Sequence, residues 1–509
     1  MSATLFRSRA VLCAFLCLAG AGAGFGTAAA IAPPPTLASG TVGAGDLKGG
    51  TTVTLPLCVV TTPTGVTTTT NTMNTTTRPG TPTGSCTTTA TTPTRTITTP
   101  TTTLSTSDVP PPAAPASKAL TALQKALNRD INGQGGKNSA LVIDETTDQT
   151  LWDYDGSVGR LPASVEKLYT TSTALLDFGP DATFQTRVLG TGKLLAGGTW
   201  DGTLYLCGGG DPTFGSMTFD KAMYGTGATV QALAEDLTEA GIRQVRGKIV
   251  GDESYFDSRR GGPDSHYHAS LETEGSLSAL AYDEGFTNQF ETRLQHNPPL
   301  VAAQALAKAL AGAHIKVDRS TEVTTEITPS DAQPLATVSS PPLATLLALT
   351  NAPSNNFFAE TLVKDLGARY GSGGTTPDGV DVVRNVMAAK FGLHPRLNDG
   401  SGLSRYDLTN PQQIVYLLRE MQANPSFWTS LAVAGRSGTM HDEMLHTRAV
   451  GNCRGKTGTL HDVANLVGYC QAANGDQLVF AFMMTALTDS DAGHALEDLA
   501  GEALANYRG

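Results

Sequence analysis

Ser164 and Lys167 lie three residues apart in the stretch ASVEKLYTTSTALL, residues 163–176, where an apolar run begins. This spacing places both side chains on one side of a helix. A serine hydroxyl becomes a good nucleophile only when a base takes its proton. A lysine desolvated by apolar neighbours has a lowered pKa and can be that base in its neutral form. The pair alone is a weak signal, because S-x-x-K also occurs on ordinary surface helices.

Two further tripeptides follow this pair along the chain. Ser354-Asn355-Asn356 matches S-x-N, and Lys456-Thr457-Gly458 matches K-T-G. Each tripeptide is common alone. The ordered trio, with S-x-N between helices and K-T-G on a late strand, is typical of penicillin-binding proteins and serine β-lactamases. The motif order therefore predicts acyl transfer through a serine nucleophile.

The chain resembles one branch of that group, the D-alanyl-D-alanine carboxypeptidase/endopeptidase family of low-molecular-weight class C penicillin-binding proteins, peptidase family S13. The resemblance covers roughly residues 116–509. Its segments are PASVEK (162–167), GGGDPTF (208–214), NAPSNNFFAETL (351–362), DGSGLSRYD (399–407), VAGRSGTM (433–440) and GKTGTLHDVANLVGY (455–469). Ser354 lies 190 residues after Ser164, which leaves room for the family's folded insertion. The middle residue of S-x-N is Asn355 rather than the Asp that is frequent in the family. We expect this change to be tolerated, because in the family the outer two residues of the motif make the known active-site contacts.

The resemblance implies a role for each matched residue. Ser164 would be the acylated nucleophile and Lys167 its general base. Ser354 would relay protons to the leaving amine, and Asn356 would hold Lys167 and the substrate amide. The backbone N–H groups of Ser164 and Thr459 would form the oxyanion hole. Lys456 would complete the catalytic set, binding the substrate carboxylate and keeping the Ser-Lys site electropositive. Substrate binding would fall to the strand residues Thr457, Gly458 and Thr459.

The implied function is an exported serine-type D-Ala-D-Ala carboxypeptidase, or DD-endopeptidase, acting on peptidoglycan stem peptides through an acyl-enzyme. β-Lactams would acylate the same serine. The alternatives are a serine β-lactamase and a catalytically silent envelope-binding protein, and the intact motifs disfavour the silent protein. The net charge of −11 disfavours nucleic acid as a partner.

No cofactor or metal site is expected from the sequence. His266 and His268 could chelate a metal, but no further ligand cluster accompanies them. HDEMLH, residues 441–446, is not the HExxH zinc signature, and an ordinary loop or helix surface is the simpler interpretation.

The elements that must position these motifs form an α+β fold. We expect a serine β-lactamase/DD-peptidase-like catalytic domain, an antiparallel sheet flanked by helices, from residues 116–186 and 331–509. An α/β domain is expected to be inserted at 187–330. Helices are predicted at 116–131, 230–241, 301–314, 342–367 and 494–507, a hairpin at 139–155, and strands around 202–208, 247–252, 451–460, 465–472 and 477–487.

The first 115 residues carry a different composition. Arg7 and Arg9 precede an apolar run too short for a confident membrane span, and Ala28-Ala29-Ala30 offers a cleavage site. We therefore expect a secretory signal peptide at 1–30, with an uncleaved anchor as the alternative, and a secreted, cell-envelope protein. Residues 31–115 are rich in Thr and Pro and predict a disordered stalk or linker, with O-glycosylation as an elaboration. No later stretch is apolar enough to cross a bilayer.

Export would place the remaining cysteines in an oxidising compartment, where they tend to pair. If His461-Asp462 forms a two-residue turn, Cys453 falls opposite Cys470 on neighbouring strands, within disulfide range. A one-residue slip in register would put the two thiols on opposite faces of the sheet. We favour the bridge. The other expected states are a Cys58–Cys86 pair and a free Cys207.

Overall fold

The computed structural model describes residues 110–133, 135–288, 290–488 and 490–509. The predicted signal peptide, almost all of the predicted stalk and the predicted Cys58–Cys86 pair lie outside these residues. The described residues belong to one compact unit. Within them, no helix combines the length and the apolar character needed to cross a membrane.

A six-stranded antiparallel sheet holds the K-T-G motif. Its strand order is β10-β11-β12-β13-β1-β2. The strands are β1 (Lys137–Asp144), β2 (Gln149–Tyr154), β10 (Ala432–Val433), β11 (Cys453–Leu460), β12 (Val463–Gln471) and β13 (Gln477–Thr485). The predicted hairpin and the three predicted late strands are confirmed as β1–β2 and β11, β12 and β13.

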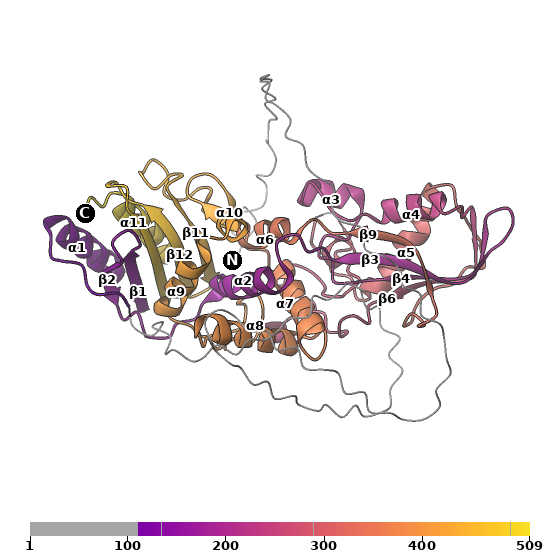
Figure 1. Ribbon diagram of the computed structural model, residues 1–509, viewed down its shortest axis with the longest axis horizontal. Helices are drawn as coiled ribbons and strands as arrows, with labels where there is room; N and C mark the ends of the chain where they lie inside the picture. The colour runs from indigo at the N-terminus through magenta and orange to yellow at the C-terminus, as the bar shows by residue number, and fades with distance from the viewer. Residues whose placement is uncertain (1–109, 134, 289, 489) are drawn as a thin grey trace, which may run out of the picture. The chain divides into compact units, whose positions relative to one another are not determined.

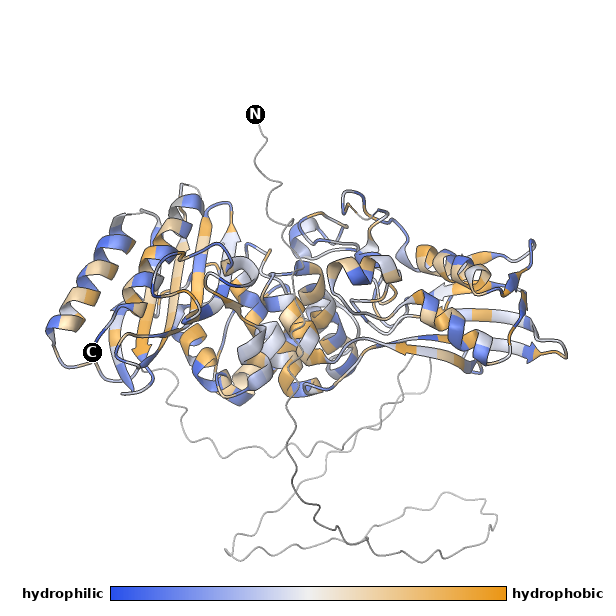
Figure 2. Cartoon of the chain, turned by 90° about the horizontal axis from the view of Figure 1, so that it is seen from above, coloured by the Kyte–Doolittle hydropathy of each residue, from blue (hydrophilic) through white to orange (hydrophobic). Residues whose placement is uncertain are grey.

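Helices cover both faces of this sheet, so its central strands are apolar on both sides. Phe480 and Phe482 pack with α1 (Lys118–Gly133) and α11 (Ser490–Ala505). Val479 and Ala481, which alternate with them, pack with α2 (Lys167–Phe178) and α9 (Pro411–Met421). This alternation follows from the two-residue period of a strand. Figure 2 shows the apolar colouring of these strands.

A second sheet carries seven strands and lies between the first two motifs in sequence. These strands are β3 (Gln185–Leu194), β4 (Thr199–Cys207), β5 (Gln244–Arg246), β6 (Ile249–Asp252), β7 (Lys316–Val317), β8 (Val323–Thr325) and β9 (Gln333–Ser339). The core beside it is built with α4 (Val230–Glu239) and α5 (Pro298–Gly312), both of which the sequence predicts. Parallel β4–β6 pairing and antiparallel β3–β4 pairing make the sheet mixed. The proposed boundaries at 187 and 330 stay a prediction.

A group of helices lies between the two sheets (Figure 1). It contains α2, α6 (Leu343–Asn351), α7 (Asn356–Tyr370) and α8 (Thr376–Phe391). Two further helices of the described residues are short: α3 (Met217–Met223) and α10 (Pro425–Ser430). The predicted helical pattern at 342–367 consists of two helices, α6 and α7. The S-x-N motif lies between them as predicted, with Ser354 and Asn355 in the turn and Asn356 as the first residue of α7.

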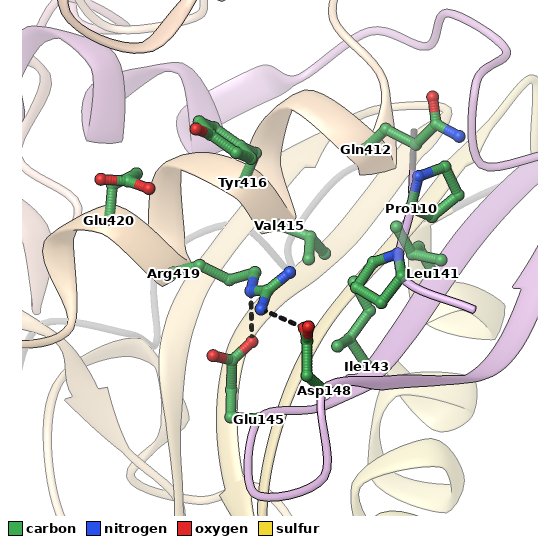
Figure 3. A pocket seen from close by; sticks show the side chains of 11 residues that line it. Pro110, Leu141, Ile143, Glu145, Asp148, Gln412, Val415, Tyr416, Arg419 and Glu420 are labelled. Atoms are coloured by element: carbon green, nitrogen blue, oxygen red, sulfur yellow. Dashed lines mark hydrogen bonds and ion pairs between the residues drawn. The ribbon is translucent and has the colours of Figure 1, made fainter. Parts of the chain in front are cut away.

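The first described residues attach to the edge of the six-stranded sheet. Thr150 in β2 donates its N–H to the carbonyl of Pro112, 2.9 Å away, and its hydroxyl to the carbonyl of Pro111, 2.7 Å away. Pro110 and Pro111 line a pocket that also includes residues of β1 and α9 (Figure 3). In this pocket Arg419 pairs with Glu145 at 2.7 Å and with Asp148 at 2.6 Å.

Candidate active site

Ser164 lies in a short 3₁₀ turn, Ala163–Glu166, and Lys167 is the first residue of α2. The sequence predicted one helix for both residues, so the structure differs at this point. Ala163 has a φ of 47°, a conformation that costs energy for a residue with a Cβ. Asn465 of β12 secures the turn, because its Nδ2 donates to the carbonyl of Pro162 at 2.8 Å.

Lys167 is completely buried and makes three hydrogen bonds. Its Nζ lies 2.9 Å from Ser164 Oγ, 2.6 Å from Asn356 Oδ1 and 2.8 Å from the carbonyl oxygen of Ser401. The Asn356 and Ser401 oxygens can only accept hydrogen bonds. A neutral amine would donate to these two and keep its lone pair for the hydroxyl proton of Ser164. The geometry is therefore suited to proton transfer from serine to lysine.

Burial also adjusts the basicity of this amine. Desolvation lowers the pKa of Lys167 to about 8, although nearby carboxylates, Glu274 first among them, act in the opposite direction. Burying a cation disfavours its charged form. A pKa near 8 leaves an appreciable fraction of the lysine neutral at physiological pH, as a general base requires.

The two outer residues of the S-x-N motif differ in their contacts: Asn356 contacts Lys167, whereas the Ser354 hydroxyl does not. Asn356 begins α7; besides contacting Lys167, it donates its backbone N–H to Glu274 Oε2 at 2.8 Å and its side-chain amide to the carbonyl of Glu272 at 2.7 Å. Asn355 caps α7 by accepting the N–H of Phe358 at 2.8 Å. Ser354 has a φ of 65°, and within the described ranges no hydrogen bond joins its hydroxyl to Ser164 or Lys167.

The K-T-G motif occupies β11, as the sequence predicts. Lys456 is buried, and its Nζ donates to the carbonyl of Thr457 at 2.9 Å. Burial and then the charge of Lys167 lower the pKa of Lys456. The Thr457 hydroxyl donates to Thr439 Oγ1 at 2.7 Å, whereas Thr459 is exposed, with its Oγ1 3.5 Å from His494 Nε2.

Gly458 lets β11 approach the turn that carries the serine. A Cβ on Gly458 would lie 2.6 Å from the carbonyl oxygen of Pro162 and 3.1 Å from a methyl group of Val165. Both neighbours belong to the segment around Ser164, so a larger residue would push the strand away from it. Gly458 therefore has a packing function here, whether or not it also contacts substrate.

Several residues at the site carry no individual prediction from the sequence. Ser401 contacts Lys167 through a backbone carbonyl, for which side-chain type is no guide, although its segment DGSGLSRYD was part of the resemblance. Asp399 shapes that segment by accepting N–H groups from Gly402 and Ser404, both at 2.7 Å. Glu274 lies in a loop without a motif. Only the fold reveals these contacts.

The predicted strand pairing beside the motif is confirmed. Leu460 pairs with Val463 across the turn, and this register sets Cys453 opposite Cys470. The two cysteines form a disulfide, with Cα atoms 4.1 Å apart. Cys207 is the free cysteine of the described residues, as expected, and its Sγ lies 2.8 Å from Thr328 Oγ1.

Comparisons with known proteins identify the family of this chain. The sequence profile of the D-Ala-D-Ala carboxypeptidase 3 (S13) family matches residues 120–270 and 265–507. A D-alanyl-D-alanine carboxypeptidase of Actinomadura sp. (strain R39) is 29% identical over 485 residues, which span 78% of this chain and 87% of that protein. Another, DacB of Haemophilus influenzae, is 23% identical over 420 residues, 67% of this chain and 84% of that protein.

Solved structures show the same fold. The crystal structure of penicillin binding protein 4 (dacB) from Haemophilus influenzae matches with a TM-score of 0.62 at 21% identity, over 76% of this chain and 98% of that one. The same protein, complexed with a β-lactam, matches with a TM-score of 0.59 at 22% identity, over 77% and 99% of the two chains. The predicted α+β, DD-peptidase-like fold class is thereby confirmed.

Proposed function

Because the chain belongs to the D-Ala-D-Ala carboxypeptidase 3 (S13) family of serine peptidases, we propose that it is an exported enzyme acylated on Ser164. Its substrates are peptidoglycan stem peptides that end in D-Ala-D-Ala, and β-lactams acylate the same serine. The contact between buried Lys167 Nζ and Ser164 Oγ, at 2.9 Å, is the observation on which this proposal rests.

Acylation begins with proton transfer. Neutral Lys167 takes the hydroxyl proton as Ser164 Oγ attacks the carbonyl carbon of the terminal peptide bond. The backbone N–H groups of Ser164 and Thr459 stabilise the oxyanion. The proton held by Lys167 passes through Ser354 to the departing D-Ala amine, the C–N bond breaks, and the ester of Ser164 remains. Water then attacks the ester and gives a proton to Lys167, which returns it to Ser164 Oγ as the shortened peptide leaves with a new carboxyl group.

Recognition of the substrate carboxylate falls to β11. Lys456 supplies positive charge in its protonated form, which an incoming carboxylate favours although burial lowers the pKa of this lysine. The hydroxyl groups of Thr457 and Thr459 supply hydrogen-bond donors. Asn356 aligns the substrate amide while holding Lys167, since its Oδ1 lies 2.6 Å from that Nζ. The hydrogen bond from Thr457 to Thr439 keeps this threonine oriented in the free enzyme.

The first test is intact-protein mass spectrometry after mixing with benzylpenicillin, followed by peptide mapping. We expect one long-lived penicilloyl adduct per chain, on Ser164. Ser164→Ala should abolish the adduct, and Lys167→Ala should slow acylation by orders of magnitude because the general base is lost. Ser258→Ala, at an exposed serine elsewhere in the chain, is the matched control and should label normally.

The lifetime of the adduct separates this proposal from the β-lactamase alternative. Rapid turnover of penicillin would favour a β-lactamase, and no adduct at all would favour a silent envelope-binding protein. Release of D-Ala from a soluble peptide ending in D-Ala-D-Ala is the direct assay. An adduct that persists in the Ser164→Ala protein would refute the assignment of the nucleophile.

A further inference from the structure

A second cluster of ionisable side chains lies where the segment after β10 meets α11. Glu443 comes from that segment, while His494 and Glu497 are three residues apart on α11 and so share one face of the helix. His494 Nδ1 is 2.9 Å from Glu497 Oε2 and 3.9 Å from Glu443 Oε1. One ligand atom from each residue lies within 4.8 Å of the others.

The two carboxylates of this cluster have more buried oxygen atoms than there are hydrogen-bond donors around them. Glu497 has a fully buried side chain, and its Oε1 has no hydrogen-bond partner among the described residues. Glu443 Oε2 is likewise buried without a partner among them. A single imidazole thus faces two carboxylates, and a buried acceptor without a donor is destabilising.

We propose that Glu443, His494 and Glu497 bind one Zn²⁺ ion, through His494 Nδ1 and one oxygen of each carboxylate. Nitrogen and oxygen ligands at about 2.0–2.2 Å in a tetrahedral site stand roughly 3.4 Å apart. The distances of 2.9 and 3.9 Å lie on either side of that value, so small side-chain rotations suffice. The His494 side chain is 34% exposed, which gives the ion and a water ligand access.

The other ring nitrogen connects this cluster to the substrate-binding strand. With a metal on Nδ1, the His494 proton resides on Nε2, which lies 3.5 Å from Thr459 Oγ1. Ring orientation in metal sites is commonly fixed by such outer contacts. The ion would therefore hold α11, the Glu443 segment and the end of β11 together. Zinc is favoured over Ca²⁺, because Ca²⁺ takes six to eight oxygen ligands.

Isothermal titration of the full chain, stripped with a chelator and titrated with ZnCl₂, tests this site. We expect one Zn²⁺ per chain, with binding weakened at least tenfold in Glu443→Gln and in Glu497→Gln. His441→Gln is the matched control, because His441 forms an exposed pair with Asp442 at 2.7 Å in the same segment and should leave zinc affinity unchanged. CaCl₂ should give no stoichiometric binding.

The thermal midpoint supplies a second readout. Zinc should raise the midpoint of the unaltered chain but not that of Glu443→Gln, since only a native-state ligand stabilises the fold. If Glu497→Gln does not fold, Glu443→Gln decides, because the Glu443 side chain is 19% exposed and tolerates a neutral replacement. Absence of stoichiometric binding, or binding unchanged in Glu443→Gln, overturns the proposal and leaves the cluster as a metal-free charged triad.

Discussion

In the proposed mechanism, the reactivity of Ser164 depends on the protonation of a single amine, that of Lys167. Lys167 has three hydrogen-bond partners, and the oxygens of Asn356 and Ser401 can only accept. When the amine loses a proton, these two bonds persist and the third reverses, so the Ser164 hydroxyl becomes the donor. The lysine therefore changes from holding the serine oxygen to accepting its proton without any movement of the chain.

The rate of acylation should follow the deprotonation of this lysine. Burial lowers the pKa of Lys167 to about 8, so the neutral base becomes abundant only as pH rises through that value. We expect the second-order rate constant for penicillin acylation to rise about tenfold per pH unit between pH 6 and 7.5 and to level off above pH 8.5. Stopped-flow fluorescence would measure it, with circular dichroism as the control for folding. A rate that is flat across this range would argue against Lys167 as the base.

At the scale of elements, the site depends on how closely β11 approaches the turn that carries Ser164. The strand passes the turn where Gly458 faces the carbonyl of Pro162. Asn465 on the neighbouring strand β12 also binds that carbonyl, at 2.8 Å. The distance between the proposed nucleophile and the proposed substrate-binding strand is thus set by two contacts to the backbone carbonyl of Pro162, one from Gly458 and one from the side chain of Asn465.

Gly458→Ala should separate these two elements. The added Cβ would lie 2.6 Å from the Pro162 carbonyl oxygen, so the strand or the turn must move. We expect a loss of about 1–3 kcal/mol in the free energy of unfolding and slower acylation by penicillin. Gly133→Ala, where a Cβ meets nothing within 4 Å, is the control and should change neither quantity. Normal acylation in Gly458→Ala would show that this close approach is not needed.

The disulfide between Cys453 and Cys470 joins β11, the strand that carries Lys456, to β12. The bond closes a loop with a sequence separation of 17 residues. Replacing both cysteines with alanine should lower the free energy of unfolding by about 3 kcal/mol, mainly through a less restricted unfolded chain. Denaturant titration would measure the loss, and Cys207→Ala serves as the single-thiol control. Alkylation of Cys453 and Cys470 in unreduced protein from an oxidising compartment would contradict the pairing.

Across the described chain, features built from local sequence patterns could be predicted from the sequence. Features built from contacts between distant residues could not. The continuous apolar runs of β12 and β13 and the apolar stripe of α1 are local, so their prediction needs no tertiary information. The motif residues Ser164, Lys167 and Asn356 were also predictable, and the fold brings them into contact. The Ser401 carbonyl and the Glu274 carboxylate were not, because a backbone acceptor and a loop acid carry no pattern of their own.

Truncation tests where the globular part of the whole molecule begins. The sequence expects it near residue 116, but three hydrogen bonds tie residues 111–114 to Thr150 in the structure. A chain beginning at residue 109 should retain full stability and activity on a soluble peptide. A chain beginning at residue 116 should lose about 3 kcal/mol, at roughly 1 kcal/mol per bond. Thermal unfolding of the two chains would decide, and equal midpoints would show that the proline segment contributes nothing.

The two contacts that Asn356 makes with the segment between the first two motifs also bear on protein engineering. The backbone N–H of Asn356 binds Glu274, and its side-chain amide binds the carbonyl of Glu272, which orients the Oδ1 atom toward Lys167. Both partners belong to the stretch proposed as an insertion. Excising residues 187–330 to obtain a minimal enzyme would therefore remove the support of the amide that we propose to be catalytic. A shortened enzyme would have to retain the Glu272–Glu274 loop. In this chain the proposed insertion and the proposed active site therefore cannot be separated without loss of these two contacts.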